Sequence, residues 1–202
     1  QEKITFNANT IEERERCIMQ KLVVRDIMVP LERYATIHED RLLIDAIDAL
    51  EKAQEKFEES PYVHRAVLAY DDNEKIVGKL SQWDVIKCLE PKYESFGDIR
   101  STSLSGLSPE LIKSMMKNYS LWQADLDDIC NRVARKKVKD VMHKPTEGEK
   151  IDADATMGEA LHSFIIGHHQ SLLVTKESEI VGILRLVDVF KLLCERVKKC
   201  RI

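Results

Sequence analysis

The chain contains one sequence unit twice, and this repeat limits the possible folds more than any other feature. Residues 76–90 (IVGKLSQWDVIKCLE) align with residues 180–194 (IVGILRLVDVFKLLC) at an offset of 104 and match at eight of fifteen positions. Upstream, residues 24–28 (VRDIM) align with residues 138–142 (VKDVM) at an offset of 114. The difference of ten residues places an insertion in the first copy, within 51–62.

Each copy predicts the element order β-α-β-β-α, in which a polar turn joins the second and third strands. The predicted helices and strands are 42–57, 66–70, 76–80 and 82–89 in the first copy, and 157–166, 172–175, 180–184 and 186–197 in the second. Gly78 and Gly182 lie inside the third strands, where glycine usually marks a bulge or a close approach of another backbone. A unit of about 60 residues is too small to bury a good core alone. We therefore expect an α+β fold in which the two repeats pack as a pseudo-twofold pair.

The segments outside the repeats predict helices. Thr10-Ile11-Glu12-Glu13 fits a capping box, and Ser108-Pro109-Glu110 combines an N-cap serine with proline at the first helical position. A further helix is expected over 125–137, with Leu126, Ile129 and Val133 facing inward. The predicted organisation is a lead-in helix over 1–23, a first repeat over 24–90, a helical insert over 91–137 and a second repeat over 138–202.

Composition excludes several classes of partner. With 31 Lys+Arg against 35 Asp+Glu, the net charge of −4 lacks the basic character of nucleic-acid-binding domains. The basic run over 132–139 is expected to be a solvated helix end. No apolar segment is long enough for a membrane span, and the N-terminus has no signal-peptide pattern. The five cysteines form no C-x-x-C pair, which indicates a reducing compartment. From charge, apolar content and cysteines together, we expect a cytoplasmic protein without nucleic-acid or membrane partners.

No local pattern predicts catalysis or a metal site. His162, His168 and His169 lack a recognisable ligand spacing, and no nucleophile stands in a familiar arrangement with a base. The seven glycines form no phosphate-binding loop. We therefore expect a protein that is not an enzyme and requires no cofactor.

The two motifs, in the same order twice, resemble the CBS-domain family, named from cystathionine β-synthase. The family pattern begins with Val-x-Asp-h-Met and ends with Gly-h-h-[Ser/Thr]-x-x-Asp, where h is apolar; here the second part runs from Gly78 to Asp84 and from Gly182 to Asp188. The resemblance covers about 24–90 and 138–197 and implies a tandem pair. Such pairs generally bind adenine nucleotides or other adenosyl ligands in clefts between the repeats and act as regulators.

The resemblance also implies contacts of individual residues with an adenosyl ligand. Ser81 would contact phosphate and Asp84 the ribose hydroxyls, while the second copy keeps Asp188 and has Arg185 in place of the hydroxyl residue. His64 and Arg65 would contact phosphate. The adenine would be enclosed by the segment after each lead-in, which contains Ala35, Thr36 and Ile37 in the first copy and Lys150 and Ile151 in the second.

Two alternatives accompany these expectations. Ser81-x-x-Asp84 is also an ordinary capping box, and Arg185 could either supply charge to a phosphate or block the pocket. At the level of function, the expected module senses AMP, ADP, ATP or S-adenosylmethionine. The alternative is an interaction scaffold with empty clefts, and a homodimer through the apolar faces of the second helices is expected in either case.

Overall fold

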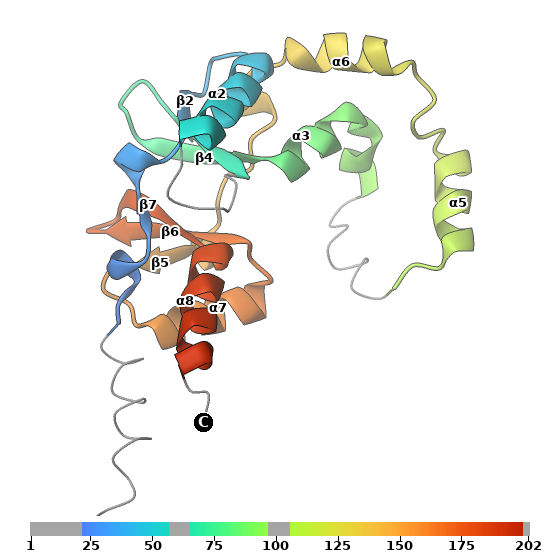
Figure 1. The fold of residues 1–202 in the computed structure, drawn as a ribbon. Helices are drawn as coiled ribbons and strands as arrows, with labels where there is room; N and C mark the ends of the chain where they lie inside the picture. Colours follow the sequence, from blue (N-terminus) through green and yellow to red (C-terminus); the bar gives the residue numbers. More distant parts are fainter. Residues whose placement is uncertain (1–21, 57–64, 97–105, 200–202) are drawn as a thin grey trace, which may run out of the picture. The chain divides into compact units, whose positions relative to one another are not determined.

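The computed structural model describes residues 22–56, 65–96 and 106–199 of the 202-residue chain, and these form two compact units (Figure 1). Unit 1 combines residues 1–34 with residues 145–202, and unit 2 contains residues 35–144. The helix predicted to begin at Thr10, residue His64 and part of the predicted insertion lie outside the described residues.

Unit 2 is built on a three-stranded sheet of order β2-β3-β4, in which β2 is parallel to β3 and β3 is antiparallel to β4. In chain order, its repeat consists of β2 (Thr36–His38), α2 (Leu43–Lys56), β3 (Ala66–Tyr70), β4 (Ile76–Ser81) and α3 (Gln82–Leu89). Neighbouring parallel strands need a crossover connection, and α2 supplies it between β2 and β3. The predicted β-α-β-β-α order is confirmed in this unit.

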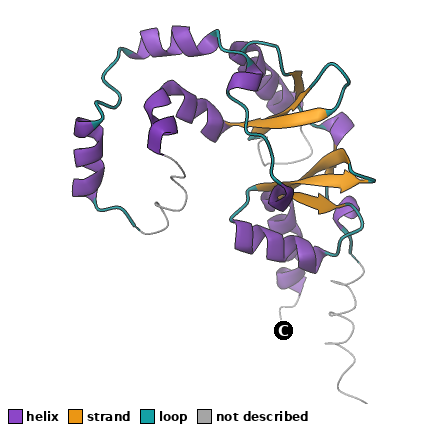
Figure 2. Ribbon diagram, turned by 180° about the vertical axis from the view of Figure 1, so that it is seen from behind, coloured by secondary structure: helices purple, strands orange, loops and turns teal. Residues whose placement is uncertain are grey.

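Unit 1 repeats the arrangement and adds a short strand from upstream, giving a sheet of order β1-β7-β6-β5. Its repeat consists of β5 (Lys150–Asp152), α7 (Met157–Gly167), β6 (Ser171–Lys176), β7 (Glu179–Arg185) and α8 (Leu186–Lys199). The upstream segment contributes the 3-10 turn η1 (Val24–Asp26), β1 (Val29–Pro30) and the 3-10 turn η2 (Leu31–Arg33). Helices α7 and α8 lie on the same side of this sheet (Figures 1 and 2). The mixed α+β class predicted from the sequence is therefore confirmed.

Each unit has a core of its own, centred on the middle strand of its sheet. Residues 66–69 of β3 and 172–174 of β6 are buried along their whole length, as the continuous apolar runs of the sequence predict. Each crossover helix adds an apolar stripe, with Leu43 and Ala46 from α2 in unit 2 and Met157 and Ala160 from α7 in unit 1. Burial of these side chains, rather than helix or strand propensity alone, stabilises the short elements.

The two Asp-x-Met lead-in segments are exchanged between the units. Residues 24–28 precede the first repeat in the sequence but belong to unit 1, where the Val24 N–H donates to the Ala155 carbonyl at 3.0 Å. Residues 138–142 precede the second repeat but belong to unit 2, where the Val138 N–H donates to the Arg41 carbonyl at 2.9 Å. Each compact unit therefore joins the body of one sequence repeat to the lead-in of the other.

This exchange explains the two glycines of the third strands. A Cβ at Gly78 of β4 would overlap the side chain of Met142, the methionine of the second lead-in. A Cβ at Gly182 of β7 would lie 2.6 Å from the Val29 carbonyl oxygen and 3.1 Å from the Met28 sulfur. The predicted close approach is thus confirmed at both positions, and in each unit the lead-in is the approaching segment.

The insert between the repeats contains α5 (Pro109–Asn118) and α6 (Leu126–Ala134). Ile129 and Val133 of α6 are buried as predicted, but Leu126 is 62% exposed because it occupies the first turn, outside the buried part of the helix. The prediction that α6 continues to residue 137 was also wrong. The Lys136 carbonyl accepts a hydrogen bond from the Leu43 N–H at 2.8 Å, so the chain leaves the helix to reach the start of α2.

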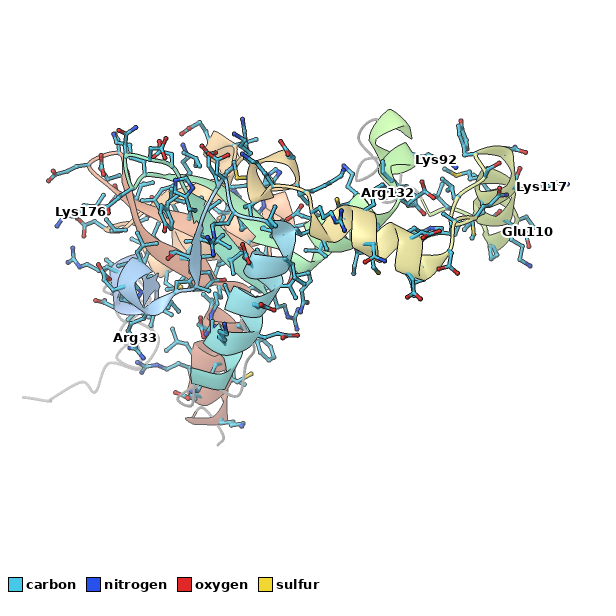
Figure 3. All side chains as sticks on the ribbon, turned by 90° about the horizontal axis from the view of Figure 1, so that it is seen from above. Arg33, Lys92, Glu110, Lys117, Arg132 and Lys176 are labelled. Atoms are coloured by element: carbon cyan, nitrogen blue, oxygen red, sulfur yellow. The ribbon has the colours of Figure 1, made fainter. Side chains whose placement is uncertain are left out.

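The insert is tied to the end of the first repeat by a buried carboxylate. Glu90 is 6% exposed, and its Oε2 accepts a hydrogen bond from the Trp122 N–H at 2.7 Å. Lys92, labelled in Figure 3, lies in the 3-10 segment η3 (Pro91–Phe96) and donates from Nζ to the Ser120 carbonyl at 2.6 Å. The segment between α5 and α6 is therefore held against the residues that follow α3.

Candidate functional site

The candidate site of unit 2 lies where the β3–β4 hairpin meets the start of α3. Ser81, the last residue of β4, is paired with Ala66, the first residue of β3. The N–H of Gln82, the first residue of α3, donates to the Arg65 carbonyl at 3.1 Å. The hairpin register thus brings Arg65 next to Ser81 and the N-terminus of α3, as the sequence-based assignment requires.

Ser81 and Asp84 form a complete capping box at the start of α3. The Asp84 N–H donates to Ser81 Oγ at 3.3 Å. Asp84 Oδ2 accepts from the Ser81 N–H at 2.8 Å and from the Ser81 hydroxyl at 2.5 Å. The capping-box interpretation is therefore confirmed as the local structure of this pair, while its contact with a ligand stays a prediction.

The two residues predicted on the lead-in side of this site differ in exposure. Thr36 and Ile37 are consecutive in β2, so their side chains point to opposite faces of the sheet. Thr36 is exposed, whereas Ile37 is 7% exposed and packs in the core of unit 2. The side chain of Ile37 is therefore not available to a ligand at this edge, although its backbone is.

The corresponding residues of unit 1 occupy equivalent places on its sheet. Arg185, the last residue of β7, is paired with Ser171, and the next N–H, of Leu186, donates to the Gln170 carbonyl at 3.0 Å. Lys150 and Ile151 lie in β5; Ile151 is in the core, and Lys150 Nζ lies 2.7 Å from Glu147 Oε1. The backbone at the start of α8 therefore repeats that at the start of α3.

Arg185 and Asp188 form a two-pronged ion pair where unit 2 has its capping box. Arg185 Nε lies 2.5 Å from Asp188 Oδ2, and Arg185 Nη2 lies 2.7 Å from Asp188 Oδ1. The two side chains are 6% and 16% exposed. Such a paired, charge-assisted contact is among the strongest side-chain interactions in proteins, so it orients both groups.

Tyr34 is a member of this cluster that the sequence reasoning missed. It follows η2, which packs on β7, and it is 7% exposed. Burial raises the pKa of the Tyr34 phenol well above its usual range; the charge of Arg185 acts against this rise and that of Asp188 adds to it. No local pattern marks Tyr34, because it reaches Arg185 only through the exchange of the lead-in segments.

The basic run over 132–139 is at the surface of unit 2, as predicted. Arg132, labelled in Figure 3, is exposed on α6. Lys137 and Lys139 place their ammonium groups 2.7 and 2.9 Å from Asp40 Oδ1. Hydrogen bonds from these two lysines lower the pKa of Asp40 to about 2. Part of the positive charge of the run is therefore compensated within the unit.

Among the described residues, no group of three or more His, Cys, Asp or Glu side chains is placed to hold a metal ion. Within the same residues, no helix combines the length and apolarity that crossing a membrane requires.

The fold and the repeated site define a protein made of two β-α-β-β-α repeats that present a helix N-terminus and an aspartate at one sheet edge each. The family model described as "CBS domain" matches residues 24–91 and 138–195. The chain therefore belongs to the CBS-domain family and carries a tandem pair of the domain. A comparison with curated proteins finds no match.

Solved structures of CBS-domain proteins share the fold. A CBS domain-containing protein of unknown function from Bacillus anthracis is 18% identical with a TM-score of 0.60, and the similarity covers 90% of this chain and 99% of that one. The CBS domain of a membrane protein from Sphaerobacter thermophilus is 18% identical with a TM-score of 0.57, covering 91% and 96%. CBSX2, solved in complex with AMP, is 16% identical with a TM-score of 0.55, covering 86% and 97%.

Proposed function

We propose that unit 2 binds an adenosine-containing nucleotide at the edge formed by Arg65, Ser81 and Asp84, and that the chain is a regulatory module rather than an enzyme. The observation that carries the proposal is the hydrogen bond from the Gln82 N–H to the Arg65 carbonyl. Through it, a cation, a hydroxyl group, a helix N-terminus and a carboxylate lie at one end of a hairpin. This combination suits a ligand that carries both phosphate and ribose.

The phosphate would be held by the cation and the helix. The N-terminus of α3 carries partial positive charge that favours an anion, and the N–H groups of Gln82 and Asp84 already donate within the unit. Arg65 is exposed, so its guanidinium is free to turn toward a phosphate and donate two parallel hydrogen bonds. Local groups must do this work, because a net charge of −4 does not attract an anion.

The ribose would be held by Asp84. A carboxylate accepts about four hydrogen bonds, and both bonds from Ser81 end on Oδ2. Oδ1 therefore keeps its capacity to accept from a ribose hydroxyl without any loss of the helix cap. The side chain of Thr36 is exposed on β2 and would lie on the adenine side of such a ligand.

AMP, ADP, ATP and S-adenosylmethionine are the proposed ligands, and no cofactor is proposed. AMP is the first to test, because the structure of CBSX2 with AMP has the same fold. We also propose a cytoplasmic location, because Cys130 and Cys194 carry free thiols, as expected in a reducing compartment.

A second function is favoured by apolar side chains on the last helix of each repeat. Trp83 and Ile86 of α3 are 62% and 53% exposed, and Phe190 of α8 is 58% exposed. Large exposed apolar side chains often mark a protein contact, so the alternative is an interaction scaffold that forms a homodimer through these faces. Trp83→Glu should then give a monomer by light scattering, and an unchanged mass would contradict dimerisation through this face.

The nucleotide proposal is tested by thermal unfolding with each of the four ligands. A ligand at 100 times its dissociation constant should stabilise the fold by about 2.7 kcal/mol. Both tryptophans, Trp83 and Trp122, belong to unit 2, so their fluorescence reports binding at that unit specifically.

The role of Asp84 is tested by Asp84→Ala, with Asp48→Ala as the matched control because Asp48 is an exposed carboxylate on α2 of the same unit. Losing a hydrogen bond to a charged group should weaken nucleotide binding about ten- to a hundredfold in Asp84→Ala and leave Asp48→Ala unchanged. Absence of any thermal shift, or unchanged affinity in Asp84→Ala, would contradict the proposal.

A further inference from the structure

We propose that Arg185 closes the second nucleotide site, so that each chain binds one nucleotide, at unit 2, and none at unit 1. This inference rests on the proposed function and concerns the specificity of the same kind of site. The backbone at the end of the last strand is equivalent in the two units. Ser81 and Arg185 both end the last strand opposite the first residue of its partner strand. The two sites can therefore be compared directly through the side chain at this position, which is Ser81 in unit 2 and Arg185 in unit 1.

The two aspartates differ in the acceptor capacity that they keep. In unit 2 both hydrogen bonds from Ser81 end on Oδ2 of Asp84, which leaves Oδ1 for a ribose hydroxyl. In unit 1 the guanidinium of Arg185 engages Oδ2 of Asp188 through Nε and Oδ1 through Nη2. The carboxylate edge that would take a ribose is thus occupied by a side chain of the same unit.

Burial makes this occupation costly to reverse. The Arg185 side chain is 6% exposed and that of Asp188 is 16% exposed, so a ribose could reach Asp188 only by separating a mostly buried ion pair. Separating such a pair leaves a charge with little solvent, which should weaken binding on the order of 10²- to 10³-fold relative to an open site. A dissociation constant of about 1 μM at unit 2 would then correspond to about 0.1–1 mM at unit 1, too weak to add a second equivalent to a titration at micromolar concentrations.

Tyr34 is a buried residue near this ion pair. It enters unit 1 through the exchanged lead-in, where β1 pairs with β7 and η2 packs on β7. Its side chain is 7% exposed and senses the charges of both Arg185 and Asp188. A segment distant in sequence therefore packs on the strand that ends with Arg185, and the ion pair itself is mostly buried.

The experiment measures binding stoichiometry by calorimetry with AMP, using the wild-type chain and Arg185→Ser. The variant restores at residue 185 the hydroxyl that unit 2 has at Ser81. We expect one AMP per wild-type chain and two per Arg185→Ser chain. The double variant Arg185→Ser/Asp188→Ala should return to one. Arg185→Gln, which is neutral and keeps much of the volume, provides a second test if the serine variant does not fold.

Several outcomes overturn the inference while leaving the proposed function intact. The first is that the wild-type chain binds two AMP molecules. The second is that Arg185→Ser and Arg185→Gln both fold and still bind only one AMP molecule per chain. The wild-type measurement needs no variant, so folding defects cannot mask it. No binding to the wild-type chain with one AMP per Arg185→Ser chain would overturn the proposed site of unit 2 and support the closure by Arg185. No binding to either protein would overturn both.

Discussion

Units 1 and 2 contain the same succession of strands and helices, but they use the last position of the final strand in opposite ways. In unit 2 the small hydroxyl of Ser81 caps α3 and shares a single oxygen of Asp84. In unit 1 the long side chain of Arg185 takes both oxygens of Asp188 and is buried with it. The two copies of the motif therefore share the same backbone but differ in their aspartate. Asp84 has one oxygen engaged by Ser81, whereas both oxygens of Asp188 are engaged by Arg185.

The comparison extends to the segment that completes each unit. Unit 2 receives the lead-in with Met142, whose flexible side chain fills the space next to Gly78. Unit 1 receives the lead-in with Val29, whose backbone oxygen lies next to Gly182, and this lead-in also delivers Tyr34 to Arg185. The glycine of unit 1 therefore faces a backbone atom, whereas that of unit 2 faces a side chain.

The largest predicted difference concerns the two aspartates. Asp188→Ala leaves the guanidinium of Arg185 buried without its carboxylate, which should reduce the free energy of unfolding by about 3–5 kcal/mol. Asp84→Ala removes only a helix cap and should cost about 1 kcal/mol. Urea unfolding followed by circular dichroism measures both. Replacing the pair together, as Arg185→Met/Asp188→Leu, should recover most of the loss, and equal costs for the two single variants would contradict the comparison.

The second largest predicted difference is between the stability costs of alanine at Gly182 and at Gly78. Alanine at Gly182 would press its Cβ against the Val29 carbonyl, and a backbone atom cannot move cheaply, so we expect a loss near the upper end of about 1–3 kcal/mol. Alanine at Gly78 meets a methionine side chain that has other rotamers, so its cost should fall near the lower end.

The control for the glycine variants removes the Met142 side chain that lies next to Gly78. Met142→Ala in the Gly78→Ala background should restore part of the lost stability, as read by the tryptophan fluorescence of unit 2. A Gly78→Ala variant that is less stable than Gly182→Ala would contradict the assignment of the rigid contact to unit 1.

The smallest predicted effect is a pH dependence carried by Tyr34. Because burial raises its pKa, the folded state favours the neutral phenol, and the resulting stability is present below the ordinary value of 10.0 and lost as the pH rises above it. The melting temperature of the wild type should therefore fall more steeply between about pH 10 and about pH 12 than that of Tyr34→Phe. Tyr119→Phe, at a tyrosine that is 50% exposed, is the control. Parallel profiles for the wild type and Tyr34→Phe would show that the phenol does not sense its surroundings in this way.

Local patterns predicted most of the secondary structure. The bounds of β3 and α3 agree with the sequence-based expectation, because an apolar run and a capping box act over a few residues. The same kind of reasoning placed the end of α6 three residues too late. There, the backbone of Lys136 binds Leu43, which is distant in sequence, and this tertiary hydrogen bond overrides the local helical pattern.

The candidate residues also divide into those that a local pattern predicted and those that it did not. Arg65, Ser81 and Asp84 were found from the motif, since the hairpin that unites them is itself local. Tyr34 was not found, because nothing within a few residues of it distinguishes it from an ordinary aromatic side chain. The choice between the two roles of Arg185 was also open, because its charge and length are compatible with both.

The amino-acid sequence by itself determined the repeat, the order of elements, the two glycines and the aspartate at the start of each final helix. These features depend on periodicity, capping and residue size over short distances. Only the tertiary structure decided which lead-in completes which unit, and therefore that the buried Tyr34 lies near Arg185 and Asp188. The physical reason is burial: an arginine and an aspartate three residues apart form a weak pair in water, and they become a tight one when a distant segment removes the solvent.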